Sequence, residues 1–409
     1  MPAGLWRGGI PTMMRCSAPV IPMSPPYSPA SPSPAPVAAG PSETEAGGLL
    51  TIDLAALQEN WRRLGQQALP VECAAVVKAD GYGCGIEQVG TALVRAGCRT
   101  FFVADLSEAR RLRPAVQDAA IYVLDGALPG SGPGFAEVNA RPVIGSLVEL
   151  AEWDRFIAGS NWHGSAGIHV DTGMNRLGMS VDEVIALAPR LHRENHGFTL
   201  LMSHLACAET PEHPLNEKQI RLFREIRVQF RGLPASLANS SGIFLGDRAH
   251  CDMVRPGVAL YGVNPTPGKP NPMLPVVGLL ARIIQVRPIA KGEAVGYGAV
   301  WTAKRAARVA IVAVGYADGY PRAASTADDT AGGEAIVAGK RCPIAGRVSM
   351  DLMAIDVTDL AQGDARRGEY ATLIGGEISV DDVARFGGTI GYEVLTRLGR
   401  RYHRVYRGA

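Results

Sequence analysis

The sequence has almost no net charge and no long apolar run, and each absence excludes a class of protein. Its 409 residues include 41 Lys and Arg against 39 Asp and Glu, a formal net charge of +2. No overall field therefore draws the chain to nucleic acid or to an anionic membrane. No apolar run reaches the ~18 residues that a transmembrane helix needs. We expect neither a nucleic-acid nor a membrane partner.

Cysteine is also scarce. The seven cysteines are odd in number and scattered, and none forms a CxxC pair or a Cys/His cluster with zinc spacing. Neither a disulfide framework nor a metal site is expected. A reducing cytoplasm is the compartment that this pattern favours.

Residues 1–47 differ in composition from the rest of the chain. Eleven of the 29 prolines lie there, including the run PPYSPASPSPAP, and each proline removes a backbone N–H and fixes φ. We interpret this stretch as a disordered leader. A secretory signal peptide would need an apolar core of roughly 7–15 residues before its cleavage site, which is lacking. A later translation start at Met13, Met14 or Met23 is the remaining alternative.

From Leu49 onward, β-type runs alternate with amphipathic segments such as EQVGTALVRA and NEKQIRLFREIRVQF. Asp53 is expected to cap the first helix. Eight strand–helix units predict an α/β fold, a (βα)8 TIM-type barrel over residues 48–270, with residues 48–60 alternatively joining the next domain. The β-type runs lie at residues 73–78, 101–104, 120–124, 142–145, 167–170, 199–203, 235–238 and 257–261.

Beyond residue 270 the helical period disappears. Runs such as LLARIIQVRPI, ARVAIVAVGY and DLMAIDV are β-type and are separated by Gly, Pro and Asp. We predict a smaller all-β C-terminal domain over residues 271–409.

Polar side chains follow several of the predicted barrel strands, at the face where barrels of this type place their working residues. The Ser240 hydroxyl and the backbone amides of Gly257 and Val258 would suit a phosphate. The side chains expected at this rim are Lys78, Asp171, Arg176, His204, Asn239, Ser240 and Arg255.

Lys78 ends the first predicted strand, in the segment VVKADGYG. Burial of its charge costs free energy, which lowers the pKa of such a lysine and makes its amine a nucleophile. Beside a phosphate loop, this favours pyridoxal phosphate bound through Lys78. A lysine whose head simply reaches solvent at a strand edge is the alternative, and position alone does not decide between them.

Nine segments, from about residue 49 to the C-terminus, resemble the alanine racemase family in the family's own order. They are VVKADGYG, DTGMNRLG, SHLA, ANSSG, MVRPGVALYG, VGYGAVW, GYADGYPR, GRVSMDLMAIDV and TIGYEV. The resemblance implies an isomerase that uses pyridoxal phosphate to interconvert L-alanine and D-alanine, and so supplies D-alanine for peptidoglycan. It also implies a homodimer with shared active sites.

The resemblance implies roles for single residues. Lys78 would bind the cofactor covalently and serve as one base, and Tyr297 from the partner's β-domain would be the opposing base. Arg255 would face the pyridine nitrogen. The residues matching the family's cofactor-binding group, with the neighbouring Asn239, are Tyr82, His204, Asn239, Ser240, Arg255, Gly257, Val258 and Tyr392. Those on the substrate side are Arg176, Met350, Tyr316 and Asp351.

The chemistry explains these residue types. Racemisation removes the α-proton from one face and returns a proton on the other, so it needs a base on each side. Nearby cations such as Arg176 would lower the pKa of a tyrosine from about 10. An arginine cannot give the pyridine nitrogen a proton, which weakens the ring as an electron sink and restrains side reactions.

Three positions depart from the family pattern. His169 stands where many members have a lysine, often carbamylated, whose negative charge orients the counterpart of Arg176. We hypothesise that another anion, such as chloride, holds Arg176 here. Cys84 and Gly391 replace a common histidine and a common asparagine. Neither replacement removes a catalytic role, and we interpret both as lineage variation.

Other functions stay open at this point. A related pyridoxal phosphate decarboxylase of basic amino acids would need a carboxylate at the ring nitrogen and a cysteine acid, and Arg255 and Tyr297 argue against it. A racemase of broader substrate range is also possible. A non-catalytic cofactor-binding protein of this family would be a lone barrel, so the second domain argues against it.

Overall fold

The computed structural model describes residues 40–193 and 196–408. Residues 1–39 of the predicted leader therefore lie outside the described residues. Residues 40–47, which we placed in that leader, instead pack against the C-terminal part of the chain. His403 Nδ1 lies 2.9 Å from Pro41 O, and Arg282 donates to Glu43 O at 2.8 Å. The prediction of disorder was therefore wrong for this short stretch, because side chains distant in sequence bind its backbone carbonyls.

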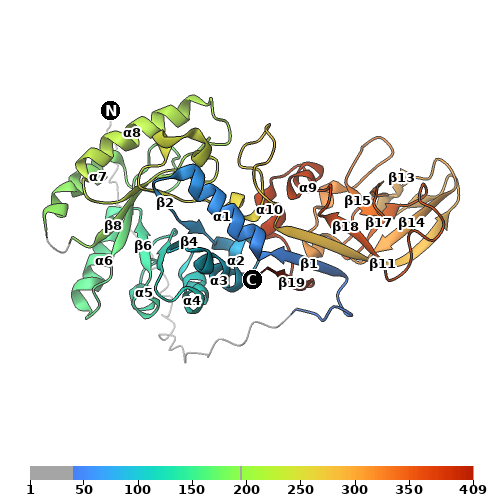
Figure 1. Ribbon diagram of the computed structural model, residues 1–409, viewed down its shortest axis with the longest axis horizontal. Helices are drawn as coiled ribbons and strands as arrows, with labels where there is room; N and C mark the ends of the chain where they lie inside the picture. The colour runs from blue at the N-terminus through green and yellow to red at the C-terminus, as the bar shows by residue number, and fades with distance from the viewer. Residues whose placement is uncertain (1–39, 194–195, 409) are drawn as a thin grey trace, which may run out of the picture. The chain divides into compact units, whose positions relative to one another are not determined.

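The first folded unit is a parallel barrel with its helices outside the strands (Figure 1). Its strands are β2 (Glu72–Cys73), β3 (Ala75–Val76), β4 (Thr100–Val103), β5 (Ala120–Val123), β6 (Arg141–Ile144), β7 (Ala166–His169), β8 (Phe198–Met202), β9 (Ala235–Ser236) and β10 (Met253–Val254). Its helices are α1 (Leu54–Ala68), α3 (Ile86–Ala96), α4 (Leu106–Val116), α5 (Gly132–Val138), α6 (Leu147–Gly159), α7 (Val181–Leu187) and α8 (Pro214–Gln229). The segment labelled α2 (Lys78–Tyr82) is a short turn with non-helical backbone angles.

The strands follow the order β2-β10-β9-β8-β7-β6-β5-β4-β3. Only Ala74 separates β2 from β3, and its N–H donates to Val254 O at 3.0 Å. The ring of strands therefore closes, and the predicted TIM-type barrel is confirmed. Side chains that accept hydrogen bonds cap the N-termini of several of its helices. Asp53, for example, caps α1 and accepts from Ala56 N at 2.8 Å.

One predicted strand was wrong. Residues Val258–Tyr261 form a 3₁₀ turn, and the eighth strand is β10, which ends at Val254. Pro256 has no N–H to give to a strand ladder, and Leu260 N bonds back to Gly257 O at 2.9 Å. Arg255 consequently follows the last strand instead of preceding it, and the turn brings backbone amides to the barrel rim.

The second unit is rich in antiparallel strands, as predicted. Its strands are β1 (Gly48–Asp53), β11 (Val277–Ile289), β12 (Ala294–Val295), β13 (Trp301–Thr302), β14 (Ala307–Val312), β15 (Glu334–Val337), β16 (Lys340–Pro343), β17 (Met353–Asp356), β18 (Tyr370–Ile374) and β19 (His403–Arg407). The long strand β11 pairs with β1 and β18 through its first half and with β14 through its second. Two helices, α9 (Val380–Phe386) and α10 (Gly391–Thr396), were not predicted, because each is too short to show a helical period.

Residues 48–60 divide between the two units at Asp53. Strand β1 pairs with β11 and, in parallel, with β19. Helix α1 belongs to the barrel, where the buried Asn60 amide donates to Leu260 O at 3.1 Å and to Leu274 O at 2.9 Å. Within the described ranges, no helix has the length and apolar character needed to cross a membrane.

Candidate functional site

Lys78 follows β3 after one residue and opens a turn of unusual backbone conformation. Ala79, Asp80, Gly81 and Tyr82 have φ values of 53°, 57°, 62° and 52°, which is the left-handed region. For a residue with a side chain this conformation costs roughly 1–2 kcal/mol. Such strain persists only where the surrounding structure imposes it, and it is concentrated at functional sites.

Tyr82 ends this turn inside a cluster of aromatic rings. Its ring stacks on Tyr261 with centroids 4.6 Å apart, and Tyr392 of α10 lies 6.2 Å away. A Cβ atom at Gly257 would lie 2.4 Å from the Tyr82 hydroxyl. Only glycine therefore fits at position 257, where the backbone approaches the phenol directly.

Ser240 lies beside the same backbone. Its buried hydroxyl accepts from Gly257 N at 2.9 Å and from Ala259 N at 3.3 Å. Asn239 supports this loop, because its Oδ1 accepts from Gly242 N at 2.9 Å. The hydroxyls of Tyr82 and Ser240 and the amides around Gly257 thus meet at one rim, a donor set that suits a phosphate.

Arg255 is a buried cation with neutral partners. It is 3% exposed, and its guanidinium donates to Ser203 O at 2.6 Å and to Ser236 Oγ, with His204 Nδ1 at 3.4 Å. No carboxylate pairs with it in the part of the chain that the structure describes. Burial lowers the pKa of Arg255 to about 10, so it remains charged at neutral pH.

Burial and the charge of Arg255 together favour the neutral form of two histidines. Burial and then the charge of Arg255 lower the pKa of His204 to about 3 and the pKa of His169 to about 4. Burial and then the charge of Arg176 also lower the pKa of Lys78. The site therefore favours uncharged imidazoles and a more readily deprotonated amine.

Arg176 lies in the loop between β7 and α7. Asp171 shapes this loop, since its Oδ1 accepts from Gly173 N at 2.8 Å and from Met174 N at 2.9 Å. The side chain of Arg176 is exposed, and its charge acts on Lys78, His169 and His204. It belongs to the same rim, and the anion that we hypothesise beside it stays a prediction.

The remaining predicted residues form a second group in the β-domain. Tyr316 and Met350 are neighbours, since Tyr316 N donates to Ser349 O at 3.0 Å and Ala317 N to Met350 O at 2.9 Å. Asp351 pairs with Arg401 at 2.7 Å. The side chains of Tyr297, Met350 and Tyr316 are 71%, 53% and 39% exposed. Among the described residues, no hydrogen bond or ring contact joins this group to Lys78.

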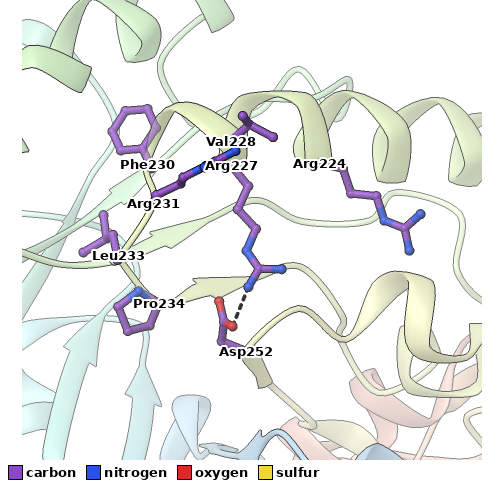
Figure 2. A pocket seen from close by; sticks show the side chains of 9 residues that line it. Arg224, Arg227, Val228, Phe230, Arg231, Leu233, Pro234 and Asp252 are labelled. Carbon is purple, nitrogen blue, oxygen red and sulfur yellow. Dashed lines mark hydrogen bonds and ion pairs between the residues drawn. The ribbon is translucent and has the colours of Figure 1, made fainter.

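The structure also contains a cavity of about 700 Å³ at the opposite end of the barrel (Figure 2). It is lined by the end of α8 and by residues just before β9 and β10, where Arg227 pairs with Asp252. Barrels of this type work at the other ends of their strands. We therefore place the candidate site around Lys78.

Sequence reasoning missed the residues that support this site. Tyr261 stacks under Tyr82, and Ser203 and Ser236 bind Arg255. Glu108 and Arg404 bind the turn after Lys78. Only Glu108 carried a local signal, as the third residue of a helix that Asp105 caps. The other contacts join segments that are remote in sequence.

Two family descriptions match almost all of the described chain. "Alanine racemase, N-terminal domain" matches residues 52–265, and "Alanine racemase, C-terminal domain" matches residues 276–406. The chain belongs to the alanine racemase family.

This chain aligns with similar members of the family over nearly their whole length. Alanine racemase of Methylobacterium sp. (strain 4-46) is 54% identical over 360 residues, which cover 88% of this chain and 98% of the relative. Alanine racemase of Methylobacterium nodulans is 52% identical, with 88% and 96% covered. The crystal structure of alanine racemase from Bartonella henselae, with covalently bound pyridoxal phosphate, superimposes with a TM-score of 0.82 at 38% identity, covering 88% and 99%.

Proposed function

We propose that this chain is a pyridoxal phosphate-dependent racemase that interconverts L-alanine and D-alanine. The observation that carries the proposal is Lys78, an amine of lowered pKa at the mouth of a barrel, beside a phosphate-type donor set and the uncompensated Arg255. The relative from Bartonella henselae holds pyridoxal phosphate covalently.

The donor set around Lys78 fits this cofactor. Tyr82, Ser240 and the amides of Gly257 and Val258 would hold its phosphate, with Tyr392 beside them. Arg255 would bind the ring nitrogen, and His204, held neutral by burial and then by the charge of Arg255, would lie against the ring. When bound, the cofactor supplies a conjugated ring that delocalises the electrons left by removal of an α-proton.

The proton transfers fall to two side chains. The Lys78 amine, whose charged form is disfavoured by burial and by Arg176, takes or returns the α-proton on one face of the substrate. Tyr297 of the partner subunit does so on the other face. Arg176, Met350, Tyr316 and Asp351 are proposed to contact the substrate or line its entrance, and the carboxylate of alanine is a natural partner for Arg176.

We further propose a homodimer whose two active sites each combine both chains. The support is the β-domain group, in which Tyr297 stands 71% exposed and Met350 53% exposed in a single chain. Large apolar and aromatic side chains exposed in this way are typical of an interface. The dimer would act in the cytoplasm and supply D-alanine for peptidoglycan.

Proton NMR tests the reaction directly. Purified protein with pyridoxal phosphate and L-alanine in D₂O should lose the α-proton signal, and chiral analysis should find D-alanine. If alanine does not exchange its α-proton, exchange with another amino acid would support a racemase of different substrate range. Release of carbon dioxide from another amino acid would support the decarboxylase. No exchange with any amino acid would overturn the proposal of catalysis.

A further inference from the structure

Residues outside the site hold the left-handed turn after Lys78 from two sides through hydrogen bonds to its backbone. We propose that Glu108 and Arg404 are positioning residues, which hold the turn Ala79–Tyr82 so that Lys78 at its start and Tyr82 at its end both face the cofactor. This inference rests on the proposed function, in that it takes Lys78 and Tyr82 as cofactor-binding residues.

Glu108 fastens the turn from the barrel side. Its buried carboxylate accepts from Asp80 N through Oε1 and from Ala104 N through Oε2, both at 2.9 Å. One side chain thus ties the turn after β3 to the segment after β4. Arg111 adds a second tie, since it donates to Asp80 at 2.6 Å and to Glu87 at 2.8 Å.

Arg404 fastens the turn from the β-domain side. From strand β19 its Nη1 donates to Gly83 O at 2.6 Å, and its Nη2 donates to Leu398 O at 3.2 Å. Tyr406, two residues later, donates to Cys84 O at 3.0 Å. A Cβ at Gly83 would lie 2.2 Å from Leu395 O, so the end of α10 packs directly on the same backbone.

These hydrogen bonds matter because the left-handed backbone of the turn is unfavourable on its own. Ala79, Asp80 and Tyr82 have a Cβ atom that opposes positive φ. If the bonds to Asp80 N and Gly83 O are lost, these residues relax toward ordinary φ values. Such a change would turn the peptide planes between Lys78 and Tyr82, and the two side chains would no longer be presented to the same ligand.

The chain provides a matched control. Glu149 is the third residue of α6, as Glu108 is of α4, and it makes the same pair of bonds, from Ala127 N at 2.6 Å and from Gly145 N at 2.8 Å. Its two loops carry neither Lys78 nor Tyr82. Replacing Glu149 therefore removes an equivalent structural bridge without touching the turn.

The test compares Glu108→Gln, Arg404→Lys and Glu149→Gln as purified holoenzymes. A glutamine keeps the shape of the side chain but can accept from only one of the two amides. We expect Glu108→Gln and Arg404→Lys to bind pyridoxal phosphate about tenfold more weakly and to shift the pH at which the absorbance of the bound cofactor changes. Glu149→Gln should lose thermal stability yet keep the wild-type affinity and pH profile.

Affinities within about twofold of wild type and unchanged pH profiles in both test variants would overturn the inference, as would equal losses in Glu149→Gln. Circular dichroism checks folding, and Arg404→Lys, the milder change, decides if Glu108→Gln does not fold. A wild-type chain that binds the cofactor but does not racemise alanine would overturn the proposed reaction alone. A wild-type chain that does not bind pyridoxal phosphate would overturn both.

Discussion

Lys78 and Tyr297 have very different surroundings in a single chain. Lys78 is half-buried at the barrel rim, where burial and then the charge of Arg176 lower its pKa against the opposing charges of Asp125 and Glu108. Tyr297 is 71% exposed, and in the proposed homodimer the environment that would activate its phenol comes from the partner chain. The two proposed bases are therefore expected to respond differently to mutation.

Replacing Tyr297 with phenylalanine should affect the two enantiomers unequally. The proposed mechanism assigns the α-proton of L-alanine to Tyr297 and that of D-alanine to Lys78. Exchange of the L-alanine α-proton with D₂O should fall by about 10²–10⁴-fold, while D-alanine should still exchange its proton through Lys78. NMR initial rates with each enantiomer measure this, and equal losses would contradict the assignment.

His169 makes the stability of the fold dependent on pH. It is 9% exposed, and its folded pKa is about 4, set by burial and then Arg255, with Asp171 acting in the opposite direction. Because the unfolded chain binds a proton more readily below pH 6.5, stability should fall as the pH drops from about 6.5 to about 4, by about 3 kcal/mol from this residue.

The variant His169→Asn should flatten that part of the profile. The free energy of unfolding, measured in urea at pH 7 and pH 5, should differ less between the two pH values in the variant than in wild type. His204, whose pKa is also lowered, would still contribute a slope. An unaltered difference would show that His169 is not buried as a neutral imidazole.

At the scale of elements, the short turn after β10 shapes the proposed phosphate pocket. Its backbone passes so near to Tyr82 that a Cβ at Gly257 would lie 2.4 Å from the phenol oxygen. The pocket thus depends on the packing of one turn from the end of the barrel against another from its start.

The variant Gly257→Ala should disturb both packing and binding. We expect a loss of roughly 1–3 kcal/mol in the free energy of unfolding from overpacking and weaker binding of pyridoxal phosphate. Tyr82→Phe in the same chain should restore part of the stability by removing the clashing oxygen, which a double-mutant cycle measures. Gly159→Ala is the control, because no atom of the described residues lies within 4 Å of its Cβ position.

The sequence allowed the barrel and its rim residues to be predicted because these signals are local. Lys78 ends one apolar run, His204 directly follows another, and Ser240 lies two residues after a third. The position of each run therefore indicates which residues lie at the rim. Residues 257–261 were wrongly predicted as a strand because the sequence pattern there is a short apolar run. The missing N–H of Pro256 ends the strand ladder before this run begins. Glu108 and Arg404 were missed because they contact backbone atoms of segments to which no pattern connects them.

At the scale of the whole molecule, the proposed site residues form two groups, one at the barrel rim and one on the exposed β-domain surface. In the proposed mechanism, each group needs the other. In a head-to-tail dimer every chain would therefore give Lys78 to one site and Tyr297 to the other.

Mixing two inactive chains should restore activity. Lys78→Ala and Tyr297→Ala homodimers are each expected to be inactive, whereas their heterodimer would pair one intact Lys78 with one intact Tyr297. Racemase assays on tagged, isolated heterodimers should recover about half of the wild-type rate, one working site of two. Inactive heterodimers of confirmed composition would contradict the shared site.

Strand β1 lies between β11 and β19, so a strand from residues 48–53 completes its pairing only with residues 403–407. During synthesis on the ribosome, most of the barrel can collapse before that partner has been made. The sheet cannot close, and Arg404 cannot reach Gly83, until the last strand has left the exit tunnel. On the inference that Arg404 positions the turn, the cofactor site would be completed only after residues 403–407 have joined the sheet.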